Sequence, residues 1–443
     1  MNRTGRRIGL EQEFFLVDEA GVLSNQADEF LQRCQAMAAA AGRNPECFAP
    51  EWVKGIIEVN TPPAYTLIEL AREYLSNLKL ALQVGRELGL RLYCLSQYPL
   101  HVMPAIRDKL NYHVQARTVG YDRFLHAGRC TGTHLHLDLP EGTIDPRVGV
   151  AYNATAAGRE ELLNLYNLAT ALDAALIALS RACPFYEGRA LGLAARTVHY
   201  RGSDTFAWEG VYTHLQSVGG LQPYADSVET LVEQQFARYY AWLAAMDQAG
   251  VERHLFLESG GSLLESAWNP VRLNDLGTVE LRGTDSDYPE VTLAIAALVY
   301  NAADRVRRDR FTVRPAEGVC TFEVSGNQLS VPDFKYLNGK LLYAAVTDGV
   351  KSPEIIAYLD SILKFTTQDG EGSEYLAKLR SSLVNYQTTE AKLLEKFPPA
   401  TAEISREEGL RLVRQACDEL EEQVSSLYNN LPLVGIEASL DAT

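Results

Sequence analysis

Apolar and charged side chains alternate along residues 8–18, which read IGLEQEFFLVD. In a β-strand successive side chains point to opposite faces, so the mostly apolar even positions share one face, and Glu11 and Glu13 share the other. Two carboxylates about 7 Å apart repel each other by roughly 2 kcal/mol at an effective dielectric of about 20. The pattern therefore predicts a strand whose polar face needs a cation or water to compensate its charge.

Three further segments pair an apolar face with a face that bears carboxylate or imidazole groups. They are EWVKGIIEVNTPP at residues 51–63 with Glu58, CTGTHLHLDLP at residues 130–140 with His134 and His136, and ESAWNPVRLNDLGTVELRG at residues 265–283 with Glu280 and Arg282. The prolines should end the first of these strands, and the Asn-Asp-Leu-Gly run in the last predicts the turn of a hairpin. Such strands are typical of an antiparallel sheet with one face packed on helices and the other face open.

Most of the remaining chain has the periodicity of amphipathic helices. The predicted helices cover residues 65–89, 146–182, 224–248, 289–308, 353–365, 373–396 and 405–428. The segment RLYCLSQYP and residues 311–334 are strand-like, and TQDGEGSEY at residues 367–375 predicts a flexible linker. We expect an α+β fold with a domain that carries the chemistry at residues 1–335 and a helical accessory region at residues 336–443 packed on it.

Composition narrows the classes of partner. The 443 residues are 47% hydrophobic and 22% charged, with a net charge of −16, which is ordinary for a globular protein but unfavourable for binding nucleic acid or an anionic membrane. No run of about 18 apolar residues occurs, and the first residues lead into a strand without the apolar core of a signal peptide, so we expect a cytoplasmic protein. Seven cysteines without a CxxC pair favour buried free thiols.

The polar faces of the four strands together suggest a metal site. They carry four glutamates and two histidines, namely Glu11, Glu13, Glu58, Glu280, His134 and His136. Carboxylates in that number select hard ions such as Mg²⁺ or Mn²⁺, which commonly hold substrate phosphates. One such strand alone is more often a solvated face, but four of them favour a site. The sequence has no P-loop and no GxGxxG, so phosphates would depend on the sheet and on arginines such as Arg196, Arg201, Arg272 and Arg282.

Five segments in order carry a resemblance to a known family. They are GLEQEFFLVD, GIIEVNTPP, GTHLHLDLP, SRACPFYEGRALGLAAR and WNPVRLNDLGTVELRGTD, between about residues 8 and 287. This series resembles the motif blocks of the glutamate–cysteine ligase type 2 family, also called carboxylate–amine ligases. The resemblance implies a glutamine-synthetase-like catalytic fold, in which an antiparallel sheet curves into a half-barrel with helices behind it.

The family's chemistry is ATP-dependent amide formation with Mg²⁺, through an acyl phosphate. Carried over by position, the resemblance makes Glu11, Glu13, Glu58, His134 and Glu280 metal ligands, Arg282 and Arg272 catalytic residues, and Arg196, His136 and Arg282 contacts to ATP or phosphate. It implies γ-glutamylcysteine formation, hence a place in glutathione biosynthesis, with small-molecule substrates only. The segments LGLAAR and SRACP depart from the family's more polar pattern, which leaves the carboxylate and amine specificity open.

Three alternatives stay open at this stage. A ligase could join glutamate or another carboxylate to a different amine. A zinc hydrolase could combine the H-x-H strand with His199, His214 or His254, and a non-catalytic protein could merely bind a nucleotide or an amino acid. The apolar positions of residues 410–424 would serve as an intramolecular cover or as a dimer surface, so a homo-oligomer is possible.

Overall fold

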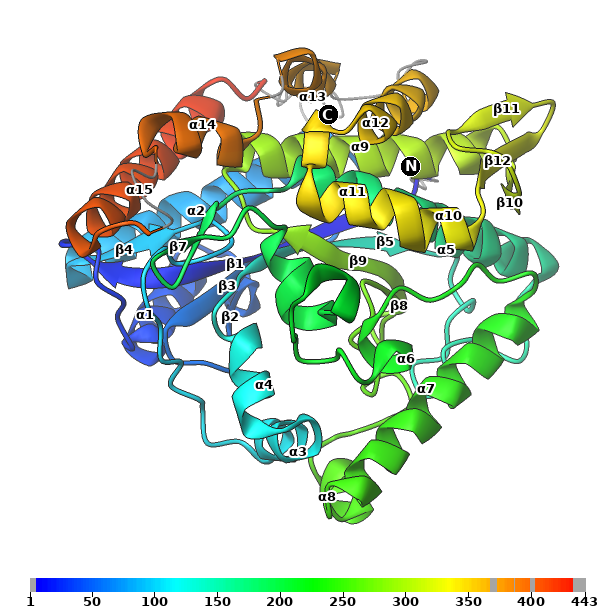
Figure 1. Cartoon of the computed structure of the whole chain (residues 1–443), viewed down its shortest axis with the longest axis horizontal. Coiled ribbons are helices and arrows are strands. Elements are labelled where there is room, and N and C mark those ends of the chain that lie inside the picture. Colours follow the sequence, from blue (N-terminus) through cyan, green and yellow to red (C-terminus); the bar gives the residue numbers. More distant parts are fainter. Residues whose placement is uncertain (1–4, 367–372, 386, 399–402, 433–443) are drawn as a thin grey trace, which may run out of the picture.

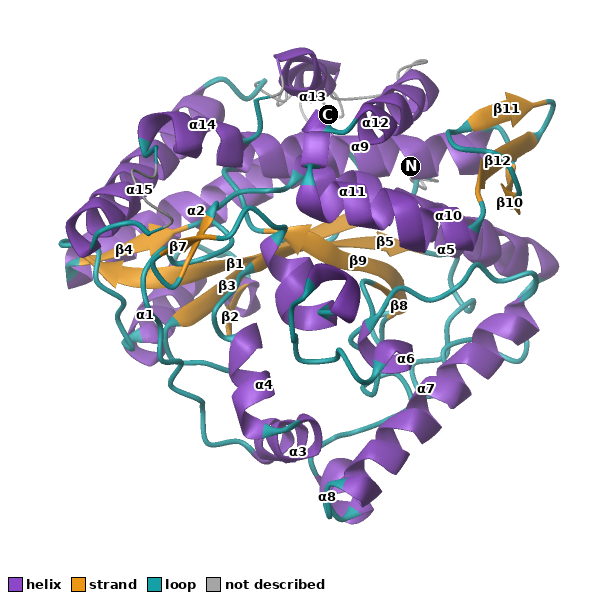
Figure 2. Ribbon diagram, in the orientation of Figure 1, coloured by secondary structure: helices purple, strands orange, loops and turns teal. Residues whose placement is uncertain are grey.

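The computed structural model describes residues 5–366, 373–385, 387–398 and 403–432. Its centre is an antiparallel sheet of seven strands in the order β2-β3-β1-β5-β9-β8, with β4 paired to the far end of β1 (Figure 2). The strands are β1 (Ile8–Asp18), β2 (Phe48–Pro50), β3 (Ile56–Asn60), β4 (Leu90–Tyr93), β5 (Gly132–Asp138), β8 (Val271–Leu273) and β9 (Thr278–Asp285). The predicted antiparallel sheet is confirmed.

Long helices cover the apolar face of this sheet. The principal ones are α2 (Leu67–Leu88), α5 (Ala156–Leu179) and α9 (Pro289–Arg308), which contact β1, β9 and β5 respectively. Behind them lie α12 (Pro353–Thr366), α13 (Ser373–Asn385), α14 (Thr389–Lys396) and α15 (Arg406–Asn429) (Figure 1). The remaining helices of this side are α10 (Phe334–Tyr336) and α11 (Leu342–Thr347), and α1 (Ala27–Ala40) packs on α2 and β2.

The polar face of the sheet is also covered, which corrects the expectation of an open face. Loops, the short helices α3 (Leu110–Val119), α4 (Tyr121–Ala127), α6 (Gln216–Gly219) and α8 (Arg253–Glu258), and the longer helix α7 (Val228–Gln248) lie over it (Figure 1). As a result His134 is only 4% exposed and Glu280 only 1%. The expectation failed because these covering segments are short or weakly periodic, so the sequence pattern did not place them on either face.

Most predicted elements are present, with shifted ends. Helix α2 is capped at its start by Thr66, whose side chain accepts a hydrogen bond from the backbone of Glu69, and at its end by Gly89 in the left-handed conformation (φ 66°). The helix predicted from residue 146 begins only after Thr155, which caps α5. The helix predicted over residues 373–396 is two helices, α13 and α14. Most of the predicted linker TQDGEGSEY lies outside the described residues.

Two small sheets complete the fold. Strands β10 (Thr312–Ala316), β11 (Glu323–Ser325) and β12 (Gln328–Pro332) form one, and β6 (Phe185–Tyr186) and β7 (Arg189–Ala190) form the other. By length and hydropathy, α5 is the one helix in the described part of the chain that could cross a membrane, but 94% of its apolar window is buried inside the fold. Core helices of folded proteins pass the same test, so α5 is weak support for a membrane span.

The C-terminal helices share the core with the sheet. Of the apolar residues that the sequence placed on one side of α15, Leu410 is half-buried, and the others are buried, namely Leu412, Val413, Ala416, Leu420 and Val424. Helix α15 contacts α2 and β4. In α14, Glu390 accepts two hydrogen bonds from Arg181 at 2.6 and 2.8 Å. The apolar side of α15 is therefore an intramolecular cover, and the division of the chain at residue 335 stays a prediction.

One polar side chain, Gln12, lies on the apolar face of β1 and is fully buried. Its amide donates to Ser286 Oγ at 2.9 Å and to the carbonyl of Asp287 at 2.6 Å, and its own carbonyl accepts from the hydroxyl of Tyr74. Thr389 is the first residue of α14, and its hydroxyl donates a hydrogen bond to the carboxylate of Asp287 at 2.8 Å. These bonds join the first strand, the start of α9 and the C-terminal helices.

The close approach of α2 and β4 gives a test of the packing. A Cβ added to Gly85 would lie 2.6 Å from the carbonyl oxygen of Leu90, whereas a Cβ added to Gly339 would meet nothing within 4 Å. We expect Gly85→Ala to lower the free energy of unfolding by about 1–3 kcal/mol and Gly339→Ala to leave it unchanged or slightly raised. Urea unfolding measures both, and equal midpoints would contradict the packing.

Candidate active site

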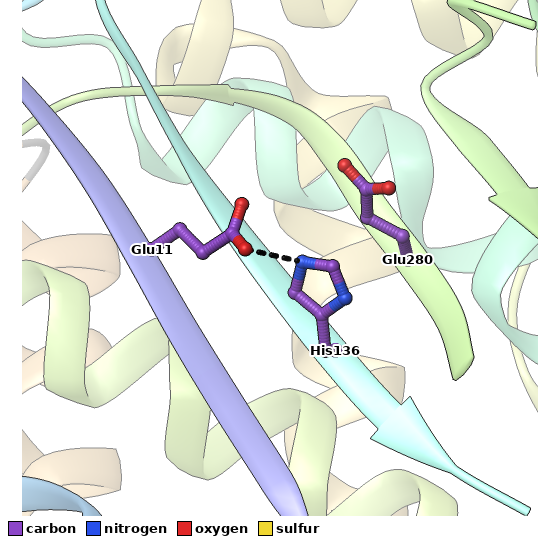
Figure 3. A group of neighbouring side chains, drawn as sticks. All are labelled: Glu11, His136 and Glu280. Atoms are coloured by element: carbon purple, nitrogen blue, oxygen red, sulfur yellow. Dashed lines mark ion pairs between the residues drawn. The ribbon is translucent and has the colours of Figure 1, made fainter. Parts of the chain in front are cut away.

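The register of the sheet brings the predicted site residues face to face. Glu11 of β1 pairs with His134 of β5, Glu13 pairs with Glu58 of β3, and His136 pairs with Glu280 of β9. Figure 3 shows Glu11, His136 and Glu280 pointing toward one another from three adjacent strands. All six carboxylate and imidazole residues predicted from the sequence therefore lie together on one face.

The imidazole and carboxylate groups are in direct contact. His134 Nδ1 lies 3.1 Å from Glu11 Oε2, and His134 Nε2 lies 3.4 Å from Glu13 Oε1. His136 Nε2 lies 3.3 Å from the other oxygen of Glu11, while His136 Nδ1 is 3.0 Å from the hydroxyl of Thr278. The carboxylate of Glu11 thus bridges the two histidines.

The residues that could ligate a metal form three overlapping groups, and within each group the ligand atoms lie within 4.8 Å of one another. The groups are Glu11, His136 and Glu280; Glu11, Glu58 and His134; and Glu13, Glu51 and Glu58. Because adjacent groups share Glu11 or Glu58, they form a row across the sheet. Oxygen-rich sets of this kind fit Mg²⁺ or Mn²⁺.

Glu51 is a candidate ligand that the sequence did not reveal. It lies in the connection between β2 and β3, outside any strand, so no alternation marked it. Its only sequence signal was its place near the start of the segment that carries Glu58. The structure brings Glu51 to Glu13 and Glu58 because the chain folds back from β2 into β3 at this point.

The electrostatics of the row indicate missing positive charge. Burial, and the charge of Glu13, raise the pKa of Glu51 to about 7, and burial with the charge of Glu11 raises the pKa of Glu58 well above its usual value. Burial opposes a charged His136, but Glu11 and Glu280 raise its pKa. Burial, with the charge of Arg196, lowers the pKa of His134, which keeps that imidazole neutral as a metal ligand requires.

Three of the predicted arginines reach the row, each in a different place. Arg196 Nη1 lies 2.9 Å from Glu13 Oε2, and its Nη2 lies 2.7 Å from His134 Nε2. Arg272 donates to Glu280 at 2.6 Å, and Arg282 Nη1 lies 3.6 Å from the other oxygen of Glu280. These contacts outweigh the burial of Glu280 and hold its pKa well below the usual value.

The other arginine considered from the sequence, Arg201, does not reach the row. It forms a buried ion pair with Asp173 of α5, with Nη1 2.7 Å from Oδ2. The histidines of the hydrolase hypothesis are also elsewhere. His199 is buried beside Gln97, while His214 and His254 lie on exposed segments near glutamates of their own neighbourhoods. None of the three belongs to a metal-ligand group among the described residues.

The position of Arg196 depends on hydrogen bonds to its backbone and on a glycine that leaves room for its side chain. Asp285, at the end of β9, accepts hydrogen bonds from the backbone N–H groups of Ala195 at 3.2 Å and Arg196 at 2.7 Å. A Cβ added to Gly132 would lie 2.5 Å from Arg196 Cδ and Nη1. The guanidinium therefore occupies the space that any other residue at position 132 would fill.

Two cavities meet the row from opposite ends. A cavity of about 210 Å³ reaches Glu13, Glu51 and Arg282 and extends between the sheet and helices α3, α4, α7 and α8. A second cavity of about 580 Å³ reaches Glu11 and His136 beside the β8–β9 turn. The row of carboxylates therefore connects two separate spaces for ligands.

The family model of "Glutamate-cysteine ligase family 2 (GCS2)" matches residues 7–415. The chain belongs to glutamate–cysteine ligase family 2. Among its relatives, "Putative glutamate--cysteine ligase 2" of Pseudomonas paraeruginosa is 27% identical over 193 residues, which cover 43% of this chain and 45% of the relative. The match thus spans less than half the length of that relative. The family predicted from the sequence is confirmed.

Two solved structures share the fold of this family member. The bifunctional glutathione synthetase from Pasteurella multocida aligns with a TM-score of 0.55 and 15% identity, over 97% of this chain and 54% of that chain. Glutamate–cysteine ligase from Francisella tularensis, in complex with AMP, aligns with a TM-score of 0.53 and 13% identity, over 96% of this chain and 93% of that chain. At these identities the likeness supports the fold alone.

The residues present fit divalent cations. The row holds five carboxylates from Glu11, Glu13, Glu51, Glu58 and Glu280, whereas three arginines approach it. Glu51 and Glu58 have no arginine within ion-pair distance in the described structure. A cation at the third group would compensate those carboxylates, whose pKa values burial and repulsion otherwise raise.

We expect Mn²⁺ binding to release protons at pH 7 and to tighten as the pH rises. Because the pKa values of Glu51, Glu58 and His136 are raised, these groups hold protons more strongly before the ion binds, and a bound ion needs them deprotonated. Isothermal titration calorimetry in two buffers of different ionisation enthalpy measures the protons released. Glu58→Gln should release fewer, and heats that do not depend on the buffer would contradict the expectation.

Proposed function

We propose that this chain is an ATP-dependent carboxylate–amine ligase that uses Mg²⁺ or Mn²⁺. The observation that supports the proposal most strongly is the row of carboxylate groups that joins two cavities. A ligase of this class needs a nucleotide and an amino acid to approach each other end to end across bound cations. We further propose that the antiparallel sheet is a half-barrel of the glutamine synthetase type, with residues 336–443 as a helical accessory region.

The larger cavity suits the nucleotide, and the smaller one suits the carboxylate substrate and the amine. Cations held by Glu11, His136 and Glu280 would neutralise phosphate oxygens, and those held by Glu13, Glu51 and Glu58 would neutralise the substrate carboxylate. The metal ligands that we propose from the sequence are Glu11, Glu13, Glu58, His134 and Glu280, with Glu51 and His136 added from the geometry.

Arg282 stands where the two substrates would react. It lines the smaller cavity and lies 3.6 Å from Glu280, whose group faces the larger cavity. We assign it to the transferred phosphoryl group, with Arg272 holding Glu280 in position and Arg196 holding Glu13 and His134. Positioning and charge neutralisation of this kind supply most of the catalysis in phosphoryl transfer.

The proposed reaction has two steps, phosphoryl transfer to the carboxylate and attack of the amine on the acyl phosphate. A carboxylate oxygen of the substrate attacks the γ-phosphorus of ATP, and the bond to the bridging oxygen breaks, so that ADP leaves and an acyl phosphate remains. The neutral amine then attacks the acyl carbon. The bond to the phosphate oxygen breaks, and the proton lost by the amine leaves with the phosphate. Glu13, His134, His136 and Glu280 are buried, which limits the access of water that would otherwise hydrolyse the acyl phosphate.

The family supports glutamate as the carboxylate substrate and cysteine as the amine, which would place the enzyme in glutathione biosynthesis. We propose small-molecule substrates only, in the cytoplasm, without a nucleic-acid or membrane partner. The identity of the amine is supported only by the names of relatives that are 27% identical to this chain. The residues of the smaller cavity bear on it independently.

The proposal is tested by incubating the protein with ATP, Mg²⁺, glutamate and a panel of amines, and by following ADP together with product mass. We expect ADP release that depends on the amine and a product equal in mass to glutamate plus amine minus water. Glu11→Ala and Glu280→Ala should each lower ADP release by at least about 100-fold, whereas Glu29→Ala, an exposed residue of α1, should not. Near-normal release in both site variants would show that the ligand groups are misplaced.

A second test concerns Arg196. Gly132→Ala should displace the guanidinium and lower kcat by about tenfold or more, because small displacements of catalytic groups cost one to two orders of magnitude. Gly339→Ala is the matched control, since its Cβ would meet nothing within 4 Å and Gly339 lines neither cavity. If both variants turn over alike, with unchanged thermal stability, Arg196 does not serve the reaction.

A further inference from the structure

The smaller cavity has two chemically different ends. Its sheet end consists of Glu13, Glu51 and Arg282. Its outer end is formed by the covering helices and the loop after α8, and the residues there include Trp242, Phe256, Gly260, Gly261, Glu265 and Trp268. We call this outer end the aromatic end. If the proposed reaction takes place at the sheet end, the aromatic end receives the body of the amine.

The aromatic end is a packed set of rings. Trp242 and Trp268 have ring centroids 4.7 Å apart, and Trp242 and Phe256 have centroids 6.3 Å apart. Trp52 and Phe124, with centroids 4.3 Å apart, also line the cavity. The rings offer few hydrogen bonds to a carboxylate. The cavity is also lined by Asn111, Gln115 and Ser259, which are neutral, and the last two already donate to Tyr212 and to the carbonyl of Phe256.

The charges at this end are negative. Arg282 is the one cationic side chain among the described residues that line the cavity, and it lies at the sheet end with the carboxylate row. At the aromatic end the acidic side chain is Glu265, an exposed residue whose charge contributes to the raised pKa of Arg272, and no ion pair to Glu265 is found in the part of the chain that the structure describes. An anionic substituent here would meet a carboxylate and aromatic faces, and both repel it.

A count of carboxylates gives the same result. Glutamate brings two carboxylates, for which the sheet end offers Arg282 and the cations of the row. An amino acid as the amine would bring a third carboxylate, and the aromatic end holds no described arginine, lysine or histidine for it. An ammonium or an aromatic ring, in contrast, fits both the rings and Glu265.

We propose that the acceptor is a primary amine with an apolar body and no carboxylate. The inference rests on the proposed ligase function and names the class of its second substrate, in place of the cysteine that the relatives' names suggest. The neutral amine attacks the acyl carbon of the acyl phosphate, the carbon–oxygen bond to phosphate breaks, and one amine proton leaves with the phosphate. The products are an N-substituted γ-glutamyl amide and inorganic phosphate.

Pairs of amines that differ only by a carboxylate give the test. ADP release is measured with glutamate and either phenethylamine or phenylalanine, and either cysteamine or cysteine, with product masses. We expect kcat/KM to be higher for the amine of each pair by about tenfold or more, the usual size of discrimination against a group that finds no partner. A preference for phenylalanine or cysteine would overturn the inference and leave the ligase function standing.

A charge reversal at the aromatic end sharpens the test. Glu265→Lys should raise the relative kcat/KM for phenylalanine over phenethylamine by about tenfold, because it supplies the missing cation. Glu258→Lys is the matched control, since Glu258 on α8 is exposed, as Glu265 is, but does not line the cavity. An unchanged ratio in Glu265→Lys would overturn the role given to this end.

Binding separates the two proposals if no ADP is released with any amine. Trp52, Trp242 and Trp268 line the cavity, so tryptophan fluorescence reports its occupancy. Tighter binding of phenethylamine than of phenylalanine would support the chemistry assigned to the cavity while the ligase function fails. Equal binding, or tighter binding of phenylalanine, would overturn both.

Discussion

The register of β1 against its neighbours is the constraint on which the site depends. Pairing sets Glu11 opposite His134 and Glu13 opposite Glu58. A shift by one residue would turn every one of these side chains to the helix-covered face. This register brings the carboxylates close enough to repel one another, and two histidines and three arginines in contact with them reduce the repulsion. The negative charges of Glu51 and Glu58 are not compensated by an arginine of the described residues, and cations fit beside these two carboxylates.

Arginines reach this row from outside the strands that carry its acids as well as from within them. Arg272 and Arg282 come from the β8–β9 hairpin, so the same register that places Glu280 places them. Arg196 comes from a loop, and its position needs Asp285 at its backbone and a glycine opposite its side chain. The sheet therefore fixes the positions of Arg272 and Arg282. The position of Arg196, which comes from a loop, depends on a few hydrogen bonds between a side chain and the backbone.

The sequence predicted the parts of the site that follow from strand alternation. Glu11, Glu13, Glu58, His134 and Glu280 were found because alternation has a period of two that the sheet preserves. Glu51 could not be found in this way, because it lies in an irregular connection whose path depends on tertiary packing. The same reason explains why the layer over the polar face was missed. Its helices α3, α4 and α8 are short, and their amphipathic signal is weak.

The hydrogen bonds of Gln12 have a consequence for how this chain can change. Gln12 lies between two proposed metal ligands of β1, and through Asp287 it is joined to Thr389 in α14. A substitution in the C-terminal helices that removes this hydroxyl would leave a buried carboxylate without one of its donors, next to the strand that carries the row. The tail and the first strand are therefore not independent parts of the molecule. Residues far apart in the sequence must vary together, and a C-terminal segment taken from another protein could replace this one only by reproducing the same donor.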